Sequence, residues 1–286
     1  MFDFPELYFP LGDWINIIVN WLTINLAPFF DAITIVIRIP LVALEHFLWW
    51  LPWWVVIVVF ASVAWKTAGW KISLLATIGL LFIGILRQWD TTMTTLAIIV
   101  TSVLVSLLIG IPIGIIAGRN ERVESSLRPV LDFMQTMPAF VYLVPAVFFF
   151  GLGKVPATVA TFIYAVPPCI RLTNLGIRQV PADIVEAGQA FGCTPMQLLF
   201  KIQLPLALPS IMAGVNQTIM MALAMVVICS MIGAAGLGLE VLRGIQRLDV
   251  GHGFIAGICI VIIAIIIDRI TQSIGTSRKT SERRRQ

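Results

Sequence analysis

Charged residues are scarce in this chain, because Asp, Glu, Lys and Arg make up 12% of its 286 residues, whereas soluble domains carry about 25%. Histidine occurs only twice, and the four cysteines form no C-x-x-C pair and have no histidine clustered beside them. The sequence therefore predicts no metal site, no disulfide framework and no bound cofactor. Neither His46 nor His252 is assigned a function.

The phosphate-binding loop G-x-x-x-x-G-K-[ST] is also missing. The nearest pattern, Gly151-Leu152-Gly153-Lys154, is too short and continues with Val155. A membrane-embedded enzyme would need His, Cys, Asp or Ser side chains gathered at one depth, and the sequence supplies no such group. We therefore expect this chain not to be an enzyme.

Apolar residues dominate instead, at 59% of the chain with a mean hydropathy of +0.96. About 20 apolar residues cross the hydrocarbon core as a helix, which predicts an all-α protein with about seven spanning helices. The predicted spans are residues 49–68, 71–87, 91–118, 128–151, 154–173, 206–233 and 252–270. They form a predicted membrane domain over residues 49–273, followed by a basic tail over residues 274–286.

The first 48 residues have a different hydrophobic pattern from the predicted spans. Apolar residues between 12 and 24 recur with helical spacing among Asp, Asn and Thr, which predicts an amphipathic helix. We expect residues 1–48 to be retained helices on the outer membrane face, broken by Pro28 and Pro40. An alternative is that part of residues 29–48 enters the membrane, although Asp31, Arg38, Glu45 and His46 interrupt that stretch.

Basic residues collect on one side of these spans if the chain begins outside, as the positive-inside rule requires of a cytoplasmic side. They are Lys66, Lys71, Arg119, Arg122, Arg128, Arg171, Arg178, Lys201, Arg278, Lys279, Arg283, Arg284 and Arg285. The other side carries Asp3, Glu6, Asp13, Asp31, Glu45, Asp90, Glu240 and Asp249. This predicts an outer N-terminus and a cytoplasmic C-terminus. Anionic inner-leaflet lipid is a sufficient partner for the net charge of +4, so nucleic acid binding is not expected.

A stripe of glycines, Gly110, Gly114 and Gly118, lies at four-residue spacing in the span over residues 91–118. Small residues let a second helix approach closely. The stripe indicates a packing seam within one subunit or between subunits, although glycine is also simply frequent in membrane helices.

A polar insert at residues 178–205 separates two long apolar spans and reads as two short helices. Pro181 suits the first turn of a helix, and Gly192 allows the chain to reverse after it. Thr194-Pro195-Met196-Gln197 has the pattern of a capping box that begins the second helix. Pro205 then opens the next span. Such an insert would be stiff and exposed, with Ala187, Ala190 and Phe191 on its surface.

The order of residues in this insert resembles the cytoplasmic loop by which permease subunits of ATP-driven (ABC-type) importers contact their ATPase. The residues that carry the resemblance are Glu186, Ala187, Gly188, Ala190, Phe191, Gly192, Ile202, Leu204 and Pro205. Gly188 departs from the pattern, because the family usually has alanine there, and glycine lowers helix propensity by roughly 1 kcal/mol. The resemblance implies a type I importer-like membrane domain whose partner subunit binds ATP and Mg²⁺.

Residues 131–145, 148–153 and 165–177 resemble more narrowly the permeases of glycine betaine/proline-type osmoprotectant importers. This resemblance covers about residues 90–270. It implies a compatible solute as substrate, of the glycine betaine, proline betaine, carnitine, choline or proline class. It also implies a bacterial inner membrane location, two ATPase subunits, an external solute-binding protein and a second copy of this chain.

No charged residue is expected at the centre of a predicted span, which argues against ion-coupled transport. Candidate pathway residues are polar or lie at helix breaks: Gln135, Thr136, Met137, Pro138, Tyr142, Asn216 and Gln217. For each of them, an ordinary interhelical hydrogen bond or apolar packing is an equally open interpretation. Two alternatives for the whole chain stay open as well, namely a permease for another small polar solute and a self-sufficient channel or carrier.

Overall fold

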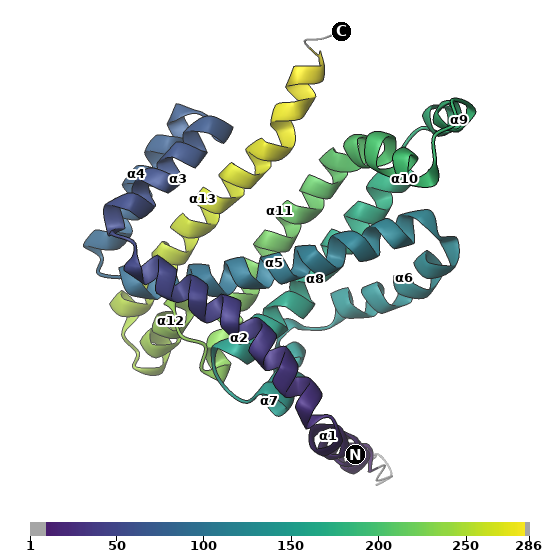
Figure 1. Cartoon of the computed structure of the whole chain (residues 1–286). Helices are drawn as coiled ribbons and strands as arrows, with labels where there is room; N and C mark the ends of the chain where they lie inside the picture. Colours follow the sequence, from purple (N-terminus) through teal and green to yellow (C-terminus); the bar gives the residue numbers. More distant parts are fainter. Residues whose placement is uncertain (1–9, 284–286) are drawn as a thin grey trace, which may run out of the picture.

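The computed structural model describes residues 10–283, with side chains as far as residue 273, and every regular element in that range is helical (Figure 1). Asp3, Glu6 and the basic side chains predicted for the tail lie outside the described residues. In chain order the elements are α1 (Leu11–Asn25), α2 (Ala27–Trp50), α3 (Trp53–Ala68), α4 (Trp70–Ile85), α5 (Trp89–Arg119), α6 (Glu121–Thr136), the 3₁₀ turn η1 (Ala139–Tyr142), α7 (Leu143–Phe150), α8 (Lys154–Arg178), α9 (Ala182–Ala190), α10 (Pro195–Leu198), the π turn η2 (Leu199–Gln203), α11 (Leu204–Ile228), the 3₁₀ turn η3 (Cys229–Ile232), α12 (Leu237–Gln246) and α13 (Val250–Arg283).

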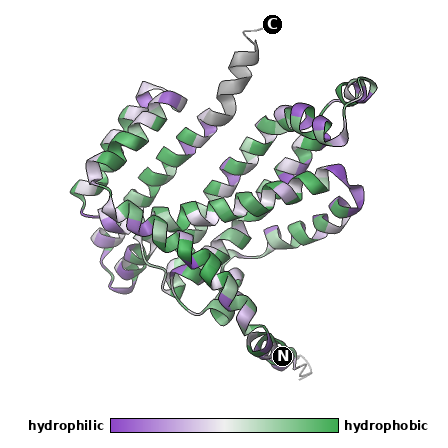
Figure 2. Cartoon of the chain, viewed as in Figure 1, coloured by the Kyte–Doolittle hydropathy of each residue, from purple (hydrophilic) through white to green (hydrophobic). Residues whose placement is uncertain are grey.

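Five of the described helices are long and apolar enough to cross a membrane: α2, α5, α8, the continuous stretch Pro195–Ile232, and α13 within Val250–Ser273. A bent pair, Glu121–Thr136 with Ala139–Phe150, counts as a sixth if it is one span. Helices α3 and α4 have 16 residues each, or about 24 Å, less than the roughly 30 Å hydrocarbon core. In Figure 2 the hydrophilic colour gathers at helix ends, around α9 and α12, while the helix bodies are mostly hydrophobic.

The glycine stripe is a packing seam inside one subunit. A Cβ atom on Gly114 would stand 2.6 Å from Cβ of Thr173, and one on Gly110 would stand 3.0 Å from Cβ of Cys169. Only glycine therefore allows α5 to approach α8 this closely. The hydroxyl of Ser102 also donates to the carbonyl of Thr158 at 3.3 Å. These contacts make α5 and α8 the closely packed centre of the bundle.

The N-terminal region confirms one predicted break and corrects another. Leu26 separates α1 from α2, and Pro28 lies in the first turn of α2, where its missing N–H costs nothing. Pro40 was expected to break the chain, yet it lies inside the continuous helix α2. A proline removes one backbone hydrogen bond from a helix, and the 24-residue length of α2 leaves many others in place.

Helix α2 contacts the same turn of the bundle from both of its ends. Near its start, the ring of Phe30 stacks on that of Phe149 with centroids 4.4 Å apart. Near its end, both carboxylate oxygens of Glu45 accept from Nζ of Lys154, at 2.6 and 2.7 Å, and Oε1 also accepts from Thr94 at 2.8 Å. Phe149 and Lys154 flank the turn at residues 151–153, so α2 lies across that turn.

The predicted span over residues 128–151 is not one straight helix. Helix α6 ends at Thr136, and the helical segment that follows is bent by 108° relative to it. Met137 and Pro138 at the junction are both extended, with ψ of 133° and 139°. Proline cannot continue the hydrogen bonding of the preceding turn, and it disfavours the helical conformation of the residue before it. Pro138 therefore accounts for the break.

Candidate functional site: the helical elbow and the broken span

Helix α9 ends in the geometry that its glycine predicts. Gly192 has a φ of +77°, its N–H donates to the carbonyl of Gln189 at 2.9 Å, and the N–H of Cys193 donates to the carbonyl of Gly188 at 3.0 Å. These two bonds form a Schellman motif, which satisfies carbonyl groups at the helix end. The predicted reversal at Gly192 is confirmed.

The start of α9 differs slightly from the prediction. Pro181 was expected in the first helical turn, but its ψ of 134° makes it the N-cap residue, and α9 begins at Ala182. The carbonyl of Pro181 accepts from Ile184 at 3.2 Å, so proline fixes the entry angle without supplying a side-chain cap. Asp183 lies in the first turn, where a carboxylate is favoured by the helix dipole.

The second elbow helix has its predicted capping box. The hydroxyl of Thr194 accepts from the N–H of Gln197 at 3.3 Å, and the side-chain oxygen of Gln197 accepts from the N–H of Thr194 at 2.9 Å. This helix was expected to end before Pro205, but α10 continues through the π turn η2 into α11. Pro205 supplies no N–H to the preceding turn, and the wider π turn accommodates its ring. Motion at the elbow is thus connected directly to a span.

Gly188 is the contact point between the two arms of the elbow. It is buried, and a Cβ atom there would stand 2.8 Å from Cδ1 of Ile202 and 2.9 Å from Cδ1 of Leu198. The missing side chain lets α9 lie directly on α10 and η2. The usual alanine would fit at this contact only if the ends of these two side chains moved aside.

The outer surface of α9 is exposed and mixed in polarity. Glu186, Ala187 and Ala190 are exposed, and the side chain of Phe191 is 90% exposed at the tip of the elbow. The helix projects from one end of the bundle in Figure 1. Aromatic side chains, Phe included, are enriched at protein–protein interfaces. Of the other motif residues, Ile202 and Leu204 are half-buried and Pro205 is exposed.

Sequence reasoning missed the side chain that fixes the root of the elbow. Arg178, the last residue of α8, donates through Nε to Oδ1 of Asn174 at 2.9 Å and through Nη2 to the carbonyl of Ala117 at 3.0 Å. It therefore fastens the end of α8 to the end of α5, just before the elbow begins. A basic residue in a last helical turn is a recognisable signal, but a carbonyl partner 61 residues away in the chain is not.

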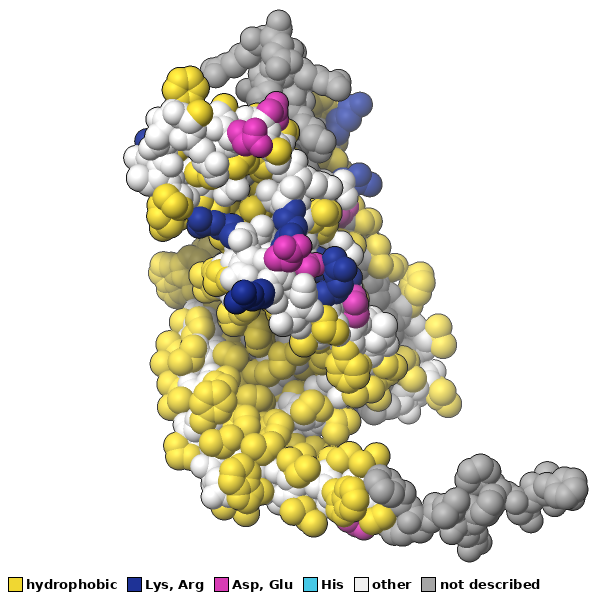
Figure 3. Space-filling view, turned by 90° about the vertical axis from the view of Figure 1, so that its right-hand side faces the viewer, with side chains coloured by type: hydrophobic (Ala, Val, Ile, Leu, Met, Phe, Trp, Pro, Cys, Tyr) yellow, Lys and Arg dark blue, Asp and Glu magenta, His cyan; other side chains and the backbone are white. Residues whose placement is uncertain are grey.

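An ion pair between Arg171 and Asp132 connects α8 to α6. Both side chains are partly exposed at the surface. Figure 3 shows charged side chains gathered in a band above a broad hydrophobic surface on this side of the molecule. The band separates the elbow from the apolar helix bodies.

The broken span places four predicted pathway residues together at one junction. Gln135, Thr136 and Pro138 are exposed and Met137 is half-buried. Because Pro138 has no N–H, the carbonyl of Met134 lacks its usual helical partner. The hydroxyl of Tyr142 donates to that carbonyl instead. Tyr142, another predicted pathway residue, is buried beside the break.

The two amides predicted on α11 have different surroundings. Asn216 donates to Oδ1 of Asp268 at 3.3 Å and accepts from the hydroxyl of Thr271 at 2.6 Å, so it forms the interhelical bonds that were the alternative interpretation. Gln217 is exposed. It lies on an open stripe of α11 at helical spacing with Ala213, Met220 and Ala224.

Metal-ligating side chains do not cluster in the part of the chain that the structure describes. No group of three or more His, Cys, Asp or Glu side chains in residues 10–273 is placed to hold a metal ion, and all four cysteines are free thiols. The arrangement instead offers a rigid contact surface and a polar break in a membrane helix.

Known proteins share this sequence over almost its whole length. The sequence profile of the family described as "Binding-protein-dependent transport system inner membrane component" matches residues 110–279. The chain is 47% identical over 282 residues to the glycine betaine/proline betaine transport system permease protein ProW of Escherichia coli (strain K12), covering 99% of this chain and 80% of that protein. It is 49% identical over 271 residues to the glycine betaine transport system permease protein OpuAB of Bacillus subtilis (strain 168), covering 95% of this chain and 96% of that protein.

Among solved structures, the MetNI methionine ABC transporter in an inward facing conformation matches with a TM-score of 0.60 and 22% identity, covering 64% of this chain and 92% of that chain. This likeness concerns the fold alone. Together, the family match and the two permease relatives assign the sequence. The chain belongs to the family of inner membrane permease components of binding-protein-dependent transport systems.

Proposed function

We propose that this chain is the translocation subunit of an ATP-driven importer of glycine betaine or a closely related compatible solute. The observation that carries the proposal is the 47% and 49% identity, over 99% and 95% of this chain, to permeases named for glycine betaine transport. An identity of this extent includes both the elbow and the broken span. The chain itself binds no nucleotide in this proposal, and a separate subunit binds ATP and Mg²⁺.

The elbow is the proposed contact with the ATP-binding subunit. Two observations support this role: both arms are capped by their own side chains and backbone, and Phe191 is exposed at the tip. Because α10 continues into α11, a push on α9 is transmitted to a span without a flexible joint. Glu186, Ala187 and Ala190 would contribute the surrounding surface, while Gly188, Ile202, Leu204 and Pro205 would hold the elbow in shape.

The broken span is the proposed lining of the solute pathway. Phe133 and Met134 have partners for their carbonyls, but those of Gln135 and Thr136 come at the very end of α6, where helices leave acceptors unpaired. Unpaired backbone at membrane depth is tolerated only where it is buried in protein or lines a wet cavity. Gln217 on the open stripe of α11 is the further candidate, whereas Asn216 and Tyr142 would support the pathway walls.

A second copy of the chain is the proposed cover for the open side of the broken span. Phe133, Phe140 and Val144 are all more than half exposed along α6, η1 and α7. These side chains would form an apolar rim around the polar junction. An external solute-binding protein would deliver the solute to the opposite end of the pathway from the elbow.

Residues 10–50 are proposed to lie on the outer membrane face, and α2 is not counted as a span. Although α2 passes the length and hydropathy criteria, it contacts both flanks of the turn at residues 151–153. A helix that crossed the membrane would reach that turn from one end only. Cysteines introduced at Asn16 and at Gln179 distinguish the two topologies, because an impermeant maleimide added to intact cells should label only the first. Labelling of position 179 alone would reverse the proposed orientation.

The test of the function is solute uptake by the reconstituted complex. Proteoliposomes that contain this chain, its ATPase and its solute-binding protein should accumulate radiolabelled glycine betaine only when ATP is supplied. Unlabelled proline betaine, carnitine, choline and proline are added in turn as competitors. The extent to which each one lowers the uptake of glycine betaine ranks the related solutes. Uptake by liposomes that contain this chain alone would instead favour a self-sufficient carrier. ATP-dependent uptake that none of these solutes lowers would indicate specificity for glycine betaine, whereas no uptake of glycine betaine by the complete complex would favour another small polar substrate.

A further inference from the structure

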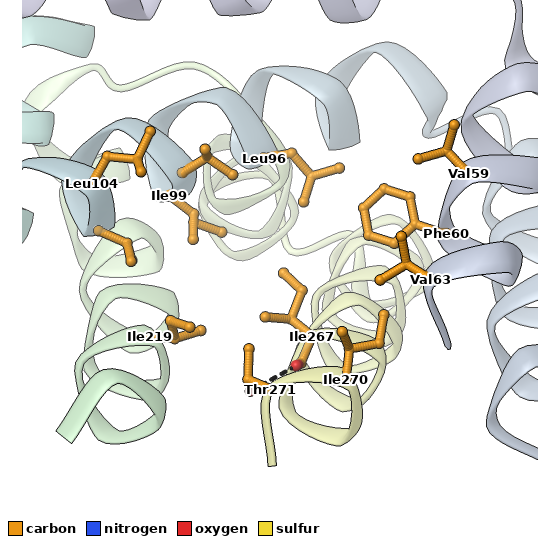
Figure 4. A pocket seen from close by; sticks show the side chains of 12 residues that line it. Val59, Phe60, Val63, Leu96, Ile99, Leu104, Ile219, Ile267, Ile270 and Thr271 are labelled. Carbon is orange, nitrogen blue, oxygen red and sulfur yellow. Dashed lines mark hydrogen bonds between the residues drawn. The ribbon is translucent and has the colours of Figure 1, made fainter. Parts of the chain in front are cut away.

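A cavity of about 300 Å³ lies between α3 and α5, away from both the elbow and the broken span. Its walls come from four helices: α3, α5, α11 and α13 (Figure 4). The lining residues are Val59, Phe60, Val63, Leu96, Ile99, Val100, Val103, Leu104, Ile219, Ile267, Ile270 and Thr271. In Figure 4 the side chains from α3 and α13 face those from α5 across the space.

The cavity has no polar group available to a solute or to water. Thr271 is the one polar side chain in the lining, and its hydroxyl already bonds Asn216 at 2.6 Å and the carbonyl of Ile267 at 2.9 Å. A water molecule needs two to four polar partners to occupy a cavity. An empty cavity, on the other hand, forfeits dispersion contacts for all of its walls. The lining therefore selects an apolar occupant.

The cavity is a groove that opens sideways from the bundle. Its floor is buried, with Leu96 at 2% exposure, while its rim is open, with Leu104 at 52%. Val59 and Val63 on α3 form the opposite rim and are also exposed. In a membrane-spanning protein, a groove that opens sideways between two apolar helices opens to lipid.

An acyl chain is the apolar occupant that a membrane supplies. It is narrower than an α-helix, which is about 10 Å wide with its side chains, and it carries no backbone polar groups that an apolar lining would leave unpaired.

Positive charge borders one end of the groove. Lys66 follows the lining residue Val63 by one helical turn on α3. Its side chain is exposed and makes no ion pair with another described residue. Trp65 is exposed beside Lys66, as indoles are at a membrane interface.

We propose that this groove is a phospholipid site, in which one acyl chain fills the space between α3 and α5 and the phosphate lies near Lys66. The lipid would pack the α3–α4 hairpin against the core, since α3 otherwise packs mainly on α4 and α13. The inference depends on the membrane location of the family and is independent of the solute carried.

The test uses the complex of this chain with its ATPase, purified in mild detergent and analysed by native mass spectrometry. One phospholipid should remain bound per permease subunit. Val100→Trp fills the open rim and should lower the retained lipid about tenfold, equivalent to 1.4 kcal/mol. The matched control is Ile109→Trp, an exposed site on the same helix outside the lining, which should retain the lipid. Equal retention in the two variants would overturn the proposal.

A measurement on the unmodified protein avoids any folding defect of the tryptophan variant. A phosphatidylglycerol with a diazirine on its acyl chain should label peptides that contain residues 59–63 and 96–104. The variant Lys66→Gln should lower this labelling, while Lys71→Gln should leave it unchanged. Labelling confined to other helices, or photo-crosslinking of position 100 to a second copy of this chain, would show that the groove does not hold a lipid.

Discussion

The elbow and the broken span are both interruptions of helices by proline and glycine, yet they differ in how they are held. The elbow is held by neighbours in the sequence: its Schellman motif and its capping box join residues at most five positions apart. The break at Pro138 is held from further away, because the carbonyl of Met134 is satisfied by Tyr142, eight residues on. The capping hydrogen bonds of the first interruption therefore close within it, whereas the second needs a side chain from the segment that follows it.

This difference matches the two proposed roles. A part that transmits force benefits from geometry that survives when its partner moves away. A pathway benefits from a junction with unpaired polar groups, because such groups at membrane depth suit a water-filled cavity. Variants in the elbow should therefore uncouple transport while leaving the membrane domain intact, and variants at the break should change stability and solute handling.

The largest effect is expected from Gly192→Val. Valine at a φ of +77° costs about 1–2 kcal/mol, and the Schellman motif should be lost. We expect uptake to fall about tenfold while ATP hydrolysis by the complex continues, measured in the same proteoliposomes. Gly192→Asn is the matched variant, since asparagine tolerates positive φ, and it should keep most of the uptake. Equal uptake by the two variants would contradict the proposed rigidity of the elbow.

Position 188 should tolerate alanine but no larger side chain. The nearest atoms to an added Cβ are the flexible ends of Leu198 and Ile202, which are able to move, and alanine raises helix propensity by about 1 kcal/mol. Gly188→Ala should therefore leave coupling unchanged. Gly188→Leu overpacks the contact at a cost of about 1–3 kcal/mol and should lower uptake severalfold at unchanged membrane insertion. If alanine lowered uptake as much as leucine, the ends of Leu198 and Ile202 would not be able to move aside as proposed.

The same contrast explains which features of the structure could be predicted from the sequence. The reversal at Gly192 and the box at Thr194 and Gln197 were predicted because caps are encoded within four residues. A helix break at Pro138 was predicted, but the 108° change of direction there was not, because a proline inside an apolar run is compatible with either a kinked or a broken helix. Hydropathy counts polarity along the chain and contains no term for direction.

Hydrogen-bond and ion-pair partners that are distant in the sequence could not be predicted, for a related reason. Glu45 was counted against membrane entry of the N-terminal region, but it is buried against Lys154, 109 residues away. Asn216 was a pathway candidate because amides are rare in apolar helices, and its partners on α13 lie more than 50 residues on. Composition reveals that a polar side chain needs a partner, but only the fold shows which one it has.

The two amides on α11 separate packing from transport at neighbouring positions. Asn216→Leu removes bonds to Asp268 and Thr271 and should lower stability by about 1 kcal/mol, near the values measured for such membrane bonds. The KM for glycine betaine uptake should not change. Gln217→Leu should do the reverse, raising KM at unchanged thermal stability. A change of KM in the first variant and not in the second would exchange the assigned roles.

The smallest effect is expected from Tyr142→Phe, which tests whether the break needs its distant partner. The substitution keeps the ring and its edge contact with Tyr164 but leaves the carbonyl of Met134 without a donor. An unmade bond to a buried group costs about 1–3 kcal/mol, and water from an open junction should reduce this to the lower end. We expect a lower thermal midpoint and a modest fall in uptake. Tyr164→Phe is the control and should change neither quantity, and if the two variants behave alike, the break is held by Pro138 alone.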